Sequence, residues 1–123
     1  MWFHLAFDQR PGYLHAIVTG PNTRENVEAY LGVILRECQE RRCSRVLIEE
    51  RLDGPRLGPV DVFDIAAGGS SHIGGLLQAI AYVDVYGVPD TMKLAETVAV
   101  NRGAPVRIFV TVADAEKWLA VSS

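Results

Sequence analysis

Segments that favour strands alternate with segments of helical spacing along most of this chain, and this alternation constrains the fold more than any other feature. The strand-like segments are short and rich in β-branched and aliphatic residues, at residues 45–50 (RVLIEE), 76–85 (LLQAIAYVDV) and 106–110 (VRIFV). Two strands that are joined through a helix in a right-handed crossover lie parallel to each other. The alternation therefore predicts an α/β fold with a mostly parallel sheet.

The first twenty residues show a different pattern. Residues 2–7 and 13–19 (YLHAIVT) both favour strands, and Arg10-Pro11-Gly12 between them favours a tight turn. Two strands joined by a short turn form an antiparallel hairpin. We therefore expect the first strand to be an antiparallel strand at the edge of the sheet.

The clearest helix is expected around residues 27–38. Apolar side chains recur there at the spacing of one helical face: Val27, Tyr30, Leu31, Ile34, Leu35 and Cys38. Asn22 or Thr23 is placed to cap its beginning.

Three further helices complete the predicted order. Residues 60–67 form a short helix, which residues 68–71 (GGSS) are expected to end. The next helix begins after Pro89 with Asp90 as its cap, and the last covers residues 112–120 with Thr111 as its cap. The predicted order of elements is ββαβαβαβα, with five strands in one sheet.

The Arg102-Gly103 pair lies between a predicted helix and the strand at residues 106–110. Glycine adopts the left-handed conformation that closes a helix, and an arginine suits the partial negative charge of the last carbonyl groups. The pair is therefore interpreted as a helix end rather than as a binding element.

Length, charge and cysteines narrow the class of protein. The 123 residues suit a single domain, residues 1–123, and the net charge of -3 disfavours a nucleic-acid partner. No apolar run reaches membrane-spanning length, and the N-terminus lacks the basic region of a signal peptide, so no membrane insertion is expected. Cys38 and Cys43 match no disulfide framework and no metal pattern, which indicates reduced thiols in a cytoplasmic protein.

The carboxyl ends of the parallel strands define the edge where an open α/β sheet binds ligands. Polar residues that follow these strand ends, beside helix starts that favour anions, are candidate ligand-binding residues. They are Asn22, Thr23, Arg51, Asp53, Asp84, Tyr86 and Asp90. The alternative interpretation is that these residues are helix caps and solvated loop residues.

A second group of residues forms a candidate interaction surface. Trp2, Phe3 and Phe7 place aromatic side chains on the expected edge strand, and an exposed apolar edge favours pairing with another chain. His15 and Arg107 lie on the half-polar faces of their strands, and His15 is expected to face His4 across the hairpin. These polar faces meet a partner if helices cover only one side of the sheet, and they lie at strand ends if helices cover both.

No catalytic, metal-binding, phosphorylated or cofactor-binding residue is predicted. His72 follows Ser70 and Ser71, but a serine–histidine pair needs an orienting carboxylate and an oxyanion pocket. The acidic residues near the strand ends, Glu50 among them, match no calcium loop.

Four segments occur together in the order of a known family: TGPNTRENV, AVNRG, VRIF and AEKWL. In this order they resemble the STAS-like domains, which are similar to bacterial anti-sigma-factor antagonists. The resemblance implies a β-α superhelical fold and a non-enzymatic role in docking to protein partners, sometimes switched by phosphorylation. Related domains of similar topology bind lipids or small ligands in apolar pockets.

Phosphorylated members carry a serine in an Asp-Ser-Ser/Thr-Gly turn at the start of the helix after the third strand. The corresponding segment here, LDGPRLGPVDVFDIA, has no serine or threonine between Asp53 and Ile65. The phosphorylation site is therefore not transferred to this chain.

Taken together, the sequence predicts a cytoplasmic, non-catalytic STAS-like domain that regulates through protein contact and forms a homodimer. The alternative is a domain that binds a small molecule or lipid at the carboxyl edge of the strands. A ligand-binding domain has an apolar cavity with a few convergent polar groups, whereas an interaction module has a filled core and an exposed patch.

Overall fold

A five-stranded sheet in the order β1-β2-β3-β4-β5 forms the centre of the structure. The computed structural model describes residues 2–73 and 76–121, without the side chains of residues 70–72. β1 is antiparallel to β2, and the other neighbouring strands are parallel, as the sequence predicts. The strands are β1 (His4–Arg10), β2 (Tyr13–Pro21), β3 (Arg45–Asp53), β4 (Ala79–Asp84) and β5 (Val106–Phe109).

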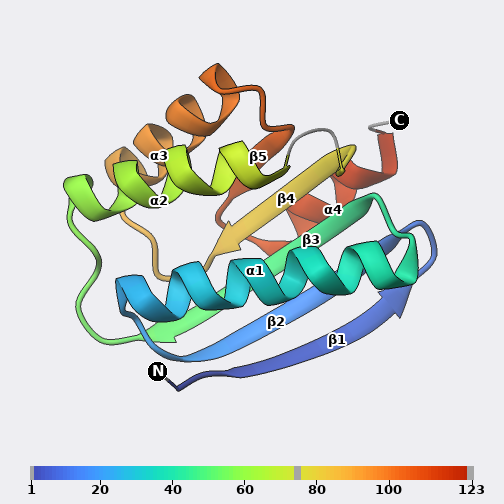
Figure 1. Ribbon diagram of the computed structural model, residues 1–123, viewed down its shortest axis with the longest axis horizontal. Helices are drawn as coiled ribbons and strands as arrows, with labels where there is room; N and C mark the ends of the chain where they lie inside the picture. Colours follow the sequence, from blue (N-terminus) through green and yellow to red (C-terminus); the bar gives the residue numbers. More distant parts are fainter. Residues whose placement is uncertain (1, 74–75, 122–123) are drawn as a thin grey trace.

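Four helices pack against the two faces of this sheet. They are α1 (Arg24–Arg41), α2 (Pro59–Ile73), α3 (Pro89–Asn101) and α4 (Val112–Val121). Figure 1 shows α1, α2 and α3 on one face and α4 on the other. The predicted order ββαβαβαβα is confirmed.

Several predicted helix ends are confirmed. The Thr23 hydroxyl accepts a hydrogen bond from the main-chain N–H of Asn26 at 3.1 Å, which caps α1. The Thr111 hydroxyl accepts from the N–H of Asp114 at 3.2 Å at the start of α4. Gly103 has a φ of 86° and closes α3, since the N–H of Ala104 donates to the carbonyl of Ala99 at 3.0 Å.

Two predicted boundaries are wrong. The cap residue of α3 is Val88, which makes no side-chain hydrogen bond, and Asp90 lies exposed in the first turn. Pro89 explains the difference, because its fixed φ and missing N–H suit the first helical position. The other error concerns α2, which continues through Gly68 and Gly69 to Ile73, since glycine weakens a helix without having to end it.

The core has two parts, one on each face of the sheet. Beneath α1, α2 and α3 lies the larger apolar cluster, which includes Leu14, Val46 and Ile34. The smaller cluster packs α4, through Ala115 and Leu119, against β3 and β4. Helices therefore cover both faces, three on one side and one on the other.

The hairpin register differs from one expectation. His4 lies opposite Thr19, and His15 lies opposite Asp8, so the two histidines do not face each other.

Among the helices in the described ranges 2–73 and 76–121, none is long and apolar enough to cross a membrane.

Candidate functional site

The register of β3 and β4 brings two carboxylates together at the carboxyl end of the sheet. Glu50 pairs with Asp84, and one step earlier in each strand Ile48 pairs with Tyr82. Side chains two residues apart point to the same face of a strand. All four side chains therefore face the layer formed by α1, α2 and α3, because Ile48 and Tyr82 belong to the core on that side.

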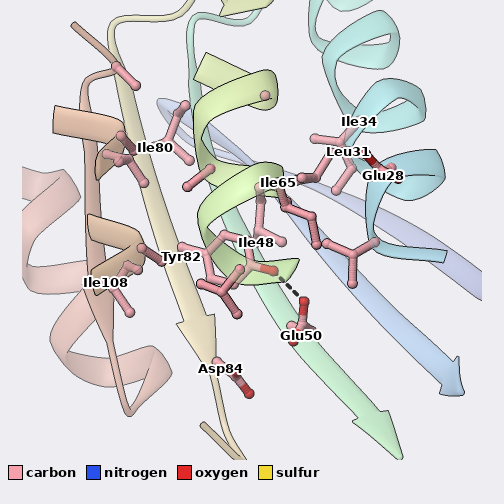
Figure 2. Close-up of a pocket in the computed structure, with 18 of the residues that line it drawn as sticks. Glu28, Leu31, Ile34, Ile48, Glu50, Ile65, Ile80, Tyr82, Asp84 and Ile108 are labelled. Atoms are coloured by element: carbon pink, nitrogen blue, oxygen red, sulfur yellow. Dashed lines mark hydrogen bonds between the residues drawn. The ribbon is translucent and has the colours of Figure 1, made fainter. Parts of the chain in front are cut away.

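A cavity of about 660 Å³ lies between this face of the sheet and the three helices. Most of its wall is apolar, with Leu31 and Ile34 from α1, Ile65 from α2, and Ile80 and Ile108 from the sheet. Figure 2 shows these side chains around the hollow, with Glu50 and Asp84 at one end. The polar groups thus converge at one end of an apolar chamber.

Small residues leave this space unfilled. Ala95 and Ala99 of α3 and Gly69 of α2 contribute to the wall, where larger side chains would fill the interior. A Cβ atom added at Gly69 would meet nothing within 4 Å. Among the described side chains of α2, none is fully buried. The cavity is therefore a consequence of short side chains on the two helices that cover it.

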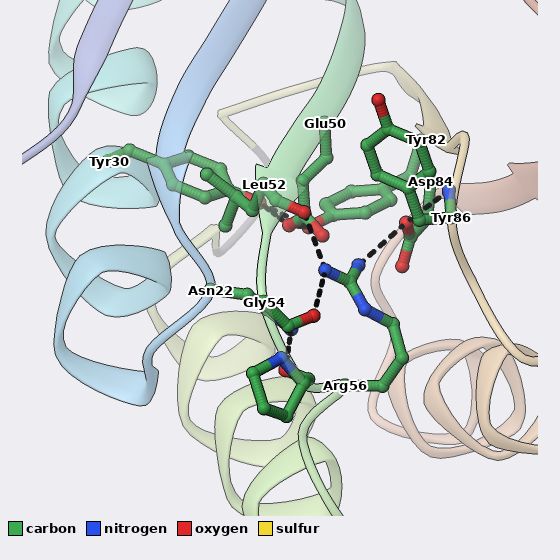
Figure 3. A network of polar contacts seen from close by, with 10 residues as sticks. Asn22, Tyr30, Glu50, Leu52, Gly54, Arg56, Tyr82, Asp84 and Tyr86 are labelled. Carbon is green, nitrogen blue, oxygen red and sulfur yellow. Dashed lines mark hydrogen bonds and ion pairs between the residues drawn. The ribbon is translucent and has the colours of Figure 1, made fainter.

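Glu50 is held by two tyrosines. The hydroxyl groups of Tyr30 and Tyr82 both donate hydrogen bonds to its Oε2 atom, and the two hydroxyl oxygens also contact each other. Tyr30 is completely buried, and Glu50 is only 4% exposed. Figure 3 shows the two rings on either side of the carboxylate. The network fixes Glu50 rigidly at the end of the cavity.

Burial controls the protonation of this cluster. Burial raises the pKa of Glu50, and the neighbouring Asp84 carboxylate raises it further. The pKa of Asp84 is also raised by burial. The pKa values of Tyr30 and Tyr82 lie well above the ordinary value, because burial and then the charge of Glu50 disfavour a phenolate. The tyrosines are therefore permanent donors, and the carboxyl groups hold a proton more readily than in water.

Arg56 brings one positive charge to the cluster (Figure 3). Its Nη2 atom donates to the carbonyl oxygens of Leu52 at 2.5 Å and Gly54 at 3.0 Å. Its Nη1 atom lies 3.6 Å from Oδ1 of Asp84, and it is buried without a hydrogen-bond partner in the described part of the chain. The guanidinium also lies over the ring of Tyr86, 5.6 Å from its centroid. One loosely paired cation therefore faces two carboxylates.

The candidate ligand-binding residues divide into two groups. Asn22 and Asp84 line the cavity, and Tyr86 covers Arg56 beside it. The Asn22 amide donates to the carbonyl of Pro55 at 2.9 Å, which holds the loop that carries Arg56.

The remaining candidates lie away from the cavity. Thr23 caps α1. Arg51 forms an ion pair with Glu49 on the opposite face of the sheet. Asp53 and Asp90 are exposed.

The candidate interaction residues also differ in exposure. Trp2 is 69% exposed and Arg107 is exposed, whereas Phe3 and Phe7 are partly buried against the core. The expectation for His15 is corrected, because its side chain is buried and lies 2.9 Å from Oε1 of Glu49. The neighbouring strand β3 supplies this acidic partner, which removes the imidazole from the surface.

The candidate ligand-binding residues predicted from the sequence do not include Tyr30, Glu50 or Tyr82, and Glu50 is considered only as a cation ligand. Tyr30 belongs to the apolar face of a predicted helix, so the sequence indicates a core residue and no polar role for its hydroxyl group. Glu50 and Tyr82 could have been found from the alternation of side chains along a strand. Glu50 follows Val46 and Ile48 at every second position, and both of these face the core. A carboxylate in such a position must be buried at the sheet edge.

The segment where the resemblance places a phosphorylated serine lies in the β3–α2 loop and the start of α2, and the side chains of Ser70 and Ser71 lie outside the described residues.

Comparison of the sequence with models of known protein families finds no match, and comparison with curated proteins finds none either. The inference about function therefore starts from the cavity and its polar end.

Proposed function

We propose that this protein binds a small, mostly apolar molecule in the cavity beneath α1, α2 and α3. The observation that carries this proposal is a chamber of about 660 Å³ with an apolar wall and a polar cluster at one end. Ligand pockets in proteins have volumes of about 300–1,000 Å³ and the same combination of apolar wall and few polar groups. The carboxyl edge of the strands, where the polar cluster lies, is the usual ligand-binding edge of such folds.

Helix α2 is the part of the cavity wall whose described side chains are least buried. Surface contacts tether it on both sides: Arg24 of α1 lies 3.4 Å from Asp61 and 3.1 Å from Asp64, and Arg102 lies over the ring of Phe63. Exposed ion pairs contribute only about 0–1 kcal/mol each. With no fully buried side chain among those described, α2 separates from the sheet at lower cost than α1.

The proposed role is binding without a chemical step. The described residues that line the cavity include no serine, cysteine, histidine or lysine. The tyrosines, with their raised pKa values, act as hydrogen-bond donors.

The test is binding of the neutral apolar dye Nile red, followed by its fluorescence. The variant Ala95→Phe places a large side chain in the wall of the cavity, and Thr97→Phe places the same side chain on the exposed face of the same helix. We expect saturable binding by the native protein and by Thr97→Phe, and at least about tenfold weaker binding by Ala95→Phe. Equal binding by both variants would exclude the cavity as the site.

A second candidate function, regulation through protein contact, is supported by the free edge of the sheet. β1 is the terminal strand of the sheet order, and the exposed Trp2 precedes it. We propose that this edge pairs with a second copy of the chain, in keeping with a cytoplasmic STAS-like domain. Light scattering of the native protein and of Trp2→Ala tests this, since the proposal requires a native dimer that the variant weakens.

A further inference from the structure

The polar end of the cavity points to a ligand with a particular head group. We infer that the apolar ligand carries one positive charge, a protonated amine, which lies against Glu50 and Asp84. The inference rests on the proposed binding function and specifies the chemical class of the ligand.

The first argument is the balance of charge. Glu50 and Asp84 are adjacent in the register, and Arg56 is the cation beside them. Arg56 pairs with Asp84 rather than with Glu50, although its charge also acts on Glu50. With both carboxyl groups ionised, the cluster has one negative charge more than it has positive charges. A monocationic head group restores neutrality, whereas a carboxylate ligand adds a further negative charge in a region of low dielectric.

The second argument is the supply of hydrogen-bond donors. A tyrosine hydroxyl has one proton, and Tyr30 and Tyr82 both direct theirs to Oε2 of Glu50. Arg56 commits its Nη2 atom to two main-chain carbonyl groups. The groups left to meet a ligand are the carboxylate oxygens of Glu50 and Asp84, which accept hydrogen bonds, and the Nη1 atom of Arg56, which lies 3.6 Å from Oδ1 of Asp84. Acceptors outnumber free donors in this set, so a ligand that supplies donors fits it best, and an ammonium group supplies three.

The groups around Glu50 define how binding depends on pH. From α1 they are Tyr30 and Glu28, which is half exposed and lies 3.4 Å from Arg24. Tyr82 and Asp84 come from β4, and Arg56 from the loop before α2. The described wall residues of α2 and α3 include no titratable side chain.

Binding of an ammonium group favours the ionised carboxyl groups. Burial raises the pKa of both, so the free site ionises at a higher pH than carboxyl groups in water do, and a bound ammonium group favours loss of the proton. The affinity for an amine therefore increases with pH until the site is fully ionised.

The experiment compares three eight-carbon probes by isothermal titration calorimetry: octylamine, octan-1-ol and sodium octanoate. At pH 8 we expect octylamine to bind at least about tenfold more tightly than octan-1-ol, and octanoate to bind most weakly. Octylamine should also bind more tightly at pH 8 than at pH 6. At a pH where the free site still holds a proton, the apparent binding enthalpy of octylamine should differ between two buffers of different ionisation enthalpy, because binding releases that proton.

Two isosteric variants test whether the ammonium group binds at Glu50. Glu50→Gln should reduce the affinity for octylamine at least about tenfold and should reduce that for octan-1-ol much less, because the alcohol has no charge to pair. Asp53→Asn, at the exposed end of the same strand, should change neither affinity. If Glu50→Gln does not fold, the comparison of the three probes and the proton release of the native protein decide the question.

The failures of the two proposals are distinguishable. If octan-1-ol or octanoate binds as tightly as octylamine, the amine inference is wrong and the apolar cavity remains a binding site. If none of the three probes binds and Nile red does not bind, both proposals are wrong.

Discussion

The substitution Glu50→Gln should make the protein more stable than the native form at neutral pH, although it alters a buried hydrogen-bonded residue. In the native protein Glu50 is 4% exposed, and burial followed by the charge of Asp84 raises its pKa. Glutamine keeps an oxygen that accepts from Tyr30 and Tyr82, and its amide offers donors toward Asp84. It has no charge to bury.

The sign of the effect follows from proton linkage. The folded protein binds the Glu50 proton more tightly than the unfolded chain does, because the folded pKa is raised. The stability of the native protein therefore falls as the pH rises from the unfolded pKa of about 4.3 to the raised folded pKa. The Glu50→Gln variant does not undergo this pH-dependent loss of stability, because glutamine has no proton to release. The variant should therefore gain stability relative to the native protein between pH 4.5 and pH 8, and because one unit of pKa shift corresponds to about 1.4 kcal/mol, the size of this gain measures the shift of Glu50.

Urea denaturation of both proteins at a series of pH values measures this difference. Asp84 and all other titratable groups are present in both proteins, so the difference between them reports Glu50 together with its coupling to Asp84. A difference in unfolding free energy that does not change with pH would refute the assignment of a raised pKa. A variant that loses stability steadily as the pH rises would show the opposite sign and would mean that Glu50 is stabilised as a carboxylate.

Three further substitutions test the local structure by urea denaturation. Gly69→Ala should stabilise the protein by about 0.5–1 kcal/mol, because alanine favours a helix and its Cβ meets nothing within 4 Å; destabilisation would show that α2 is packed at this position. Gly103→Ala should destabilise by about 1 kcal/mol, since alanine must adopt a φ of 86°; no change would contradict the helix-closing role. Tyr30→Phe should destabilise by about 1–3 kcal/mol, because a fully buried carboxyl group loses a donor; an unchanged stability would argue against the hydrogen bond to Glu50.

The fold follows from the sequence because its signals are local and agree with one another. The apolar stripe from Val27 to Cys38 and the glycine at residue 103 each have one satisfactory interpretation, and the alternation of strands and helices permits few topologies. The errors occur where local signals compete. Gly68 and Gly69 predict a helix end, yet α2 continues to Ile73.

The candidate site is only partly contained in the sequence. The carboxyl edge of the strands and two of its residues, Asn22 and Asp84, are predicted, because strand order alone brings them to that edge. The hydrogen bond between Tyr30 and Glu50 depends on how closely α1 packs on β3, and no sequence pattern specifies that distance. A cavity is likewise a property of packing volumes between several elements and has no signature within one segment.

Methyl chemical shifts test the central claim, that the cavity binds an apolar ligand, most directly. During titration with octylamine, the isoleucine methyl groups of Ile48, Ile80 and Ile108, which line the cavity, should shift and saturate together. The methyl groups of Leu47 and Leu119, in the core beneath α4, should not change. Saturable shifts confined to the first group would support the binding site, whereas the absence of shifts there, or shifts centred on the second group, would contradict it.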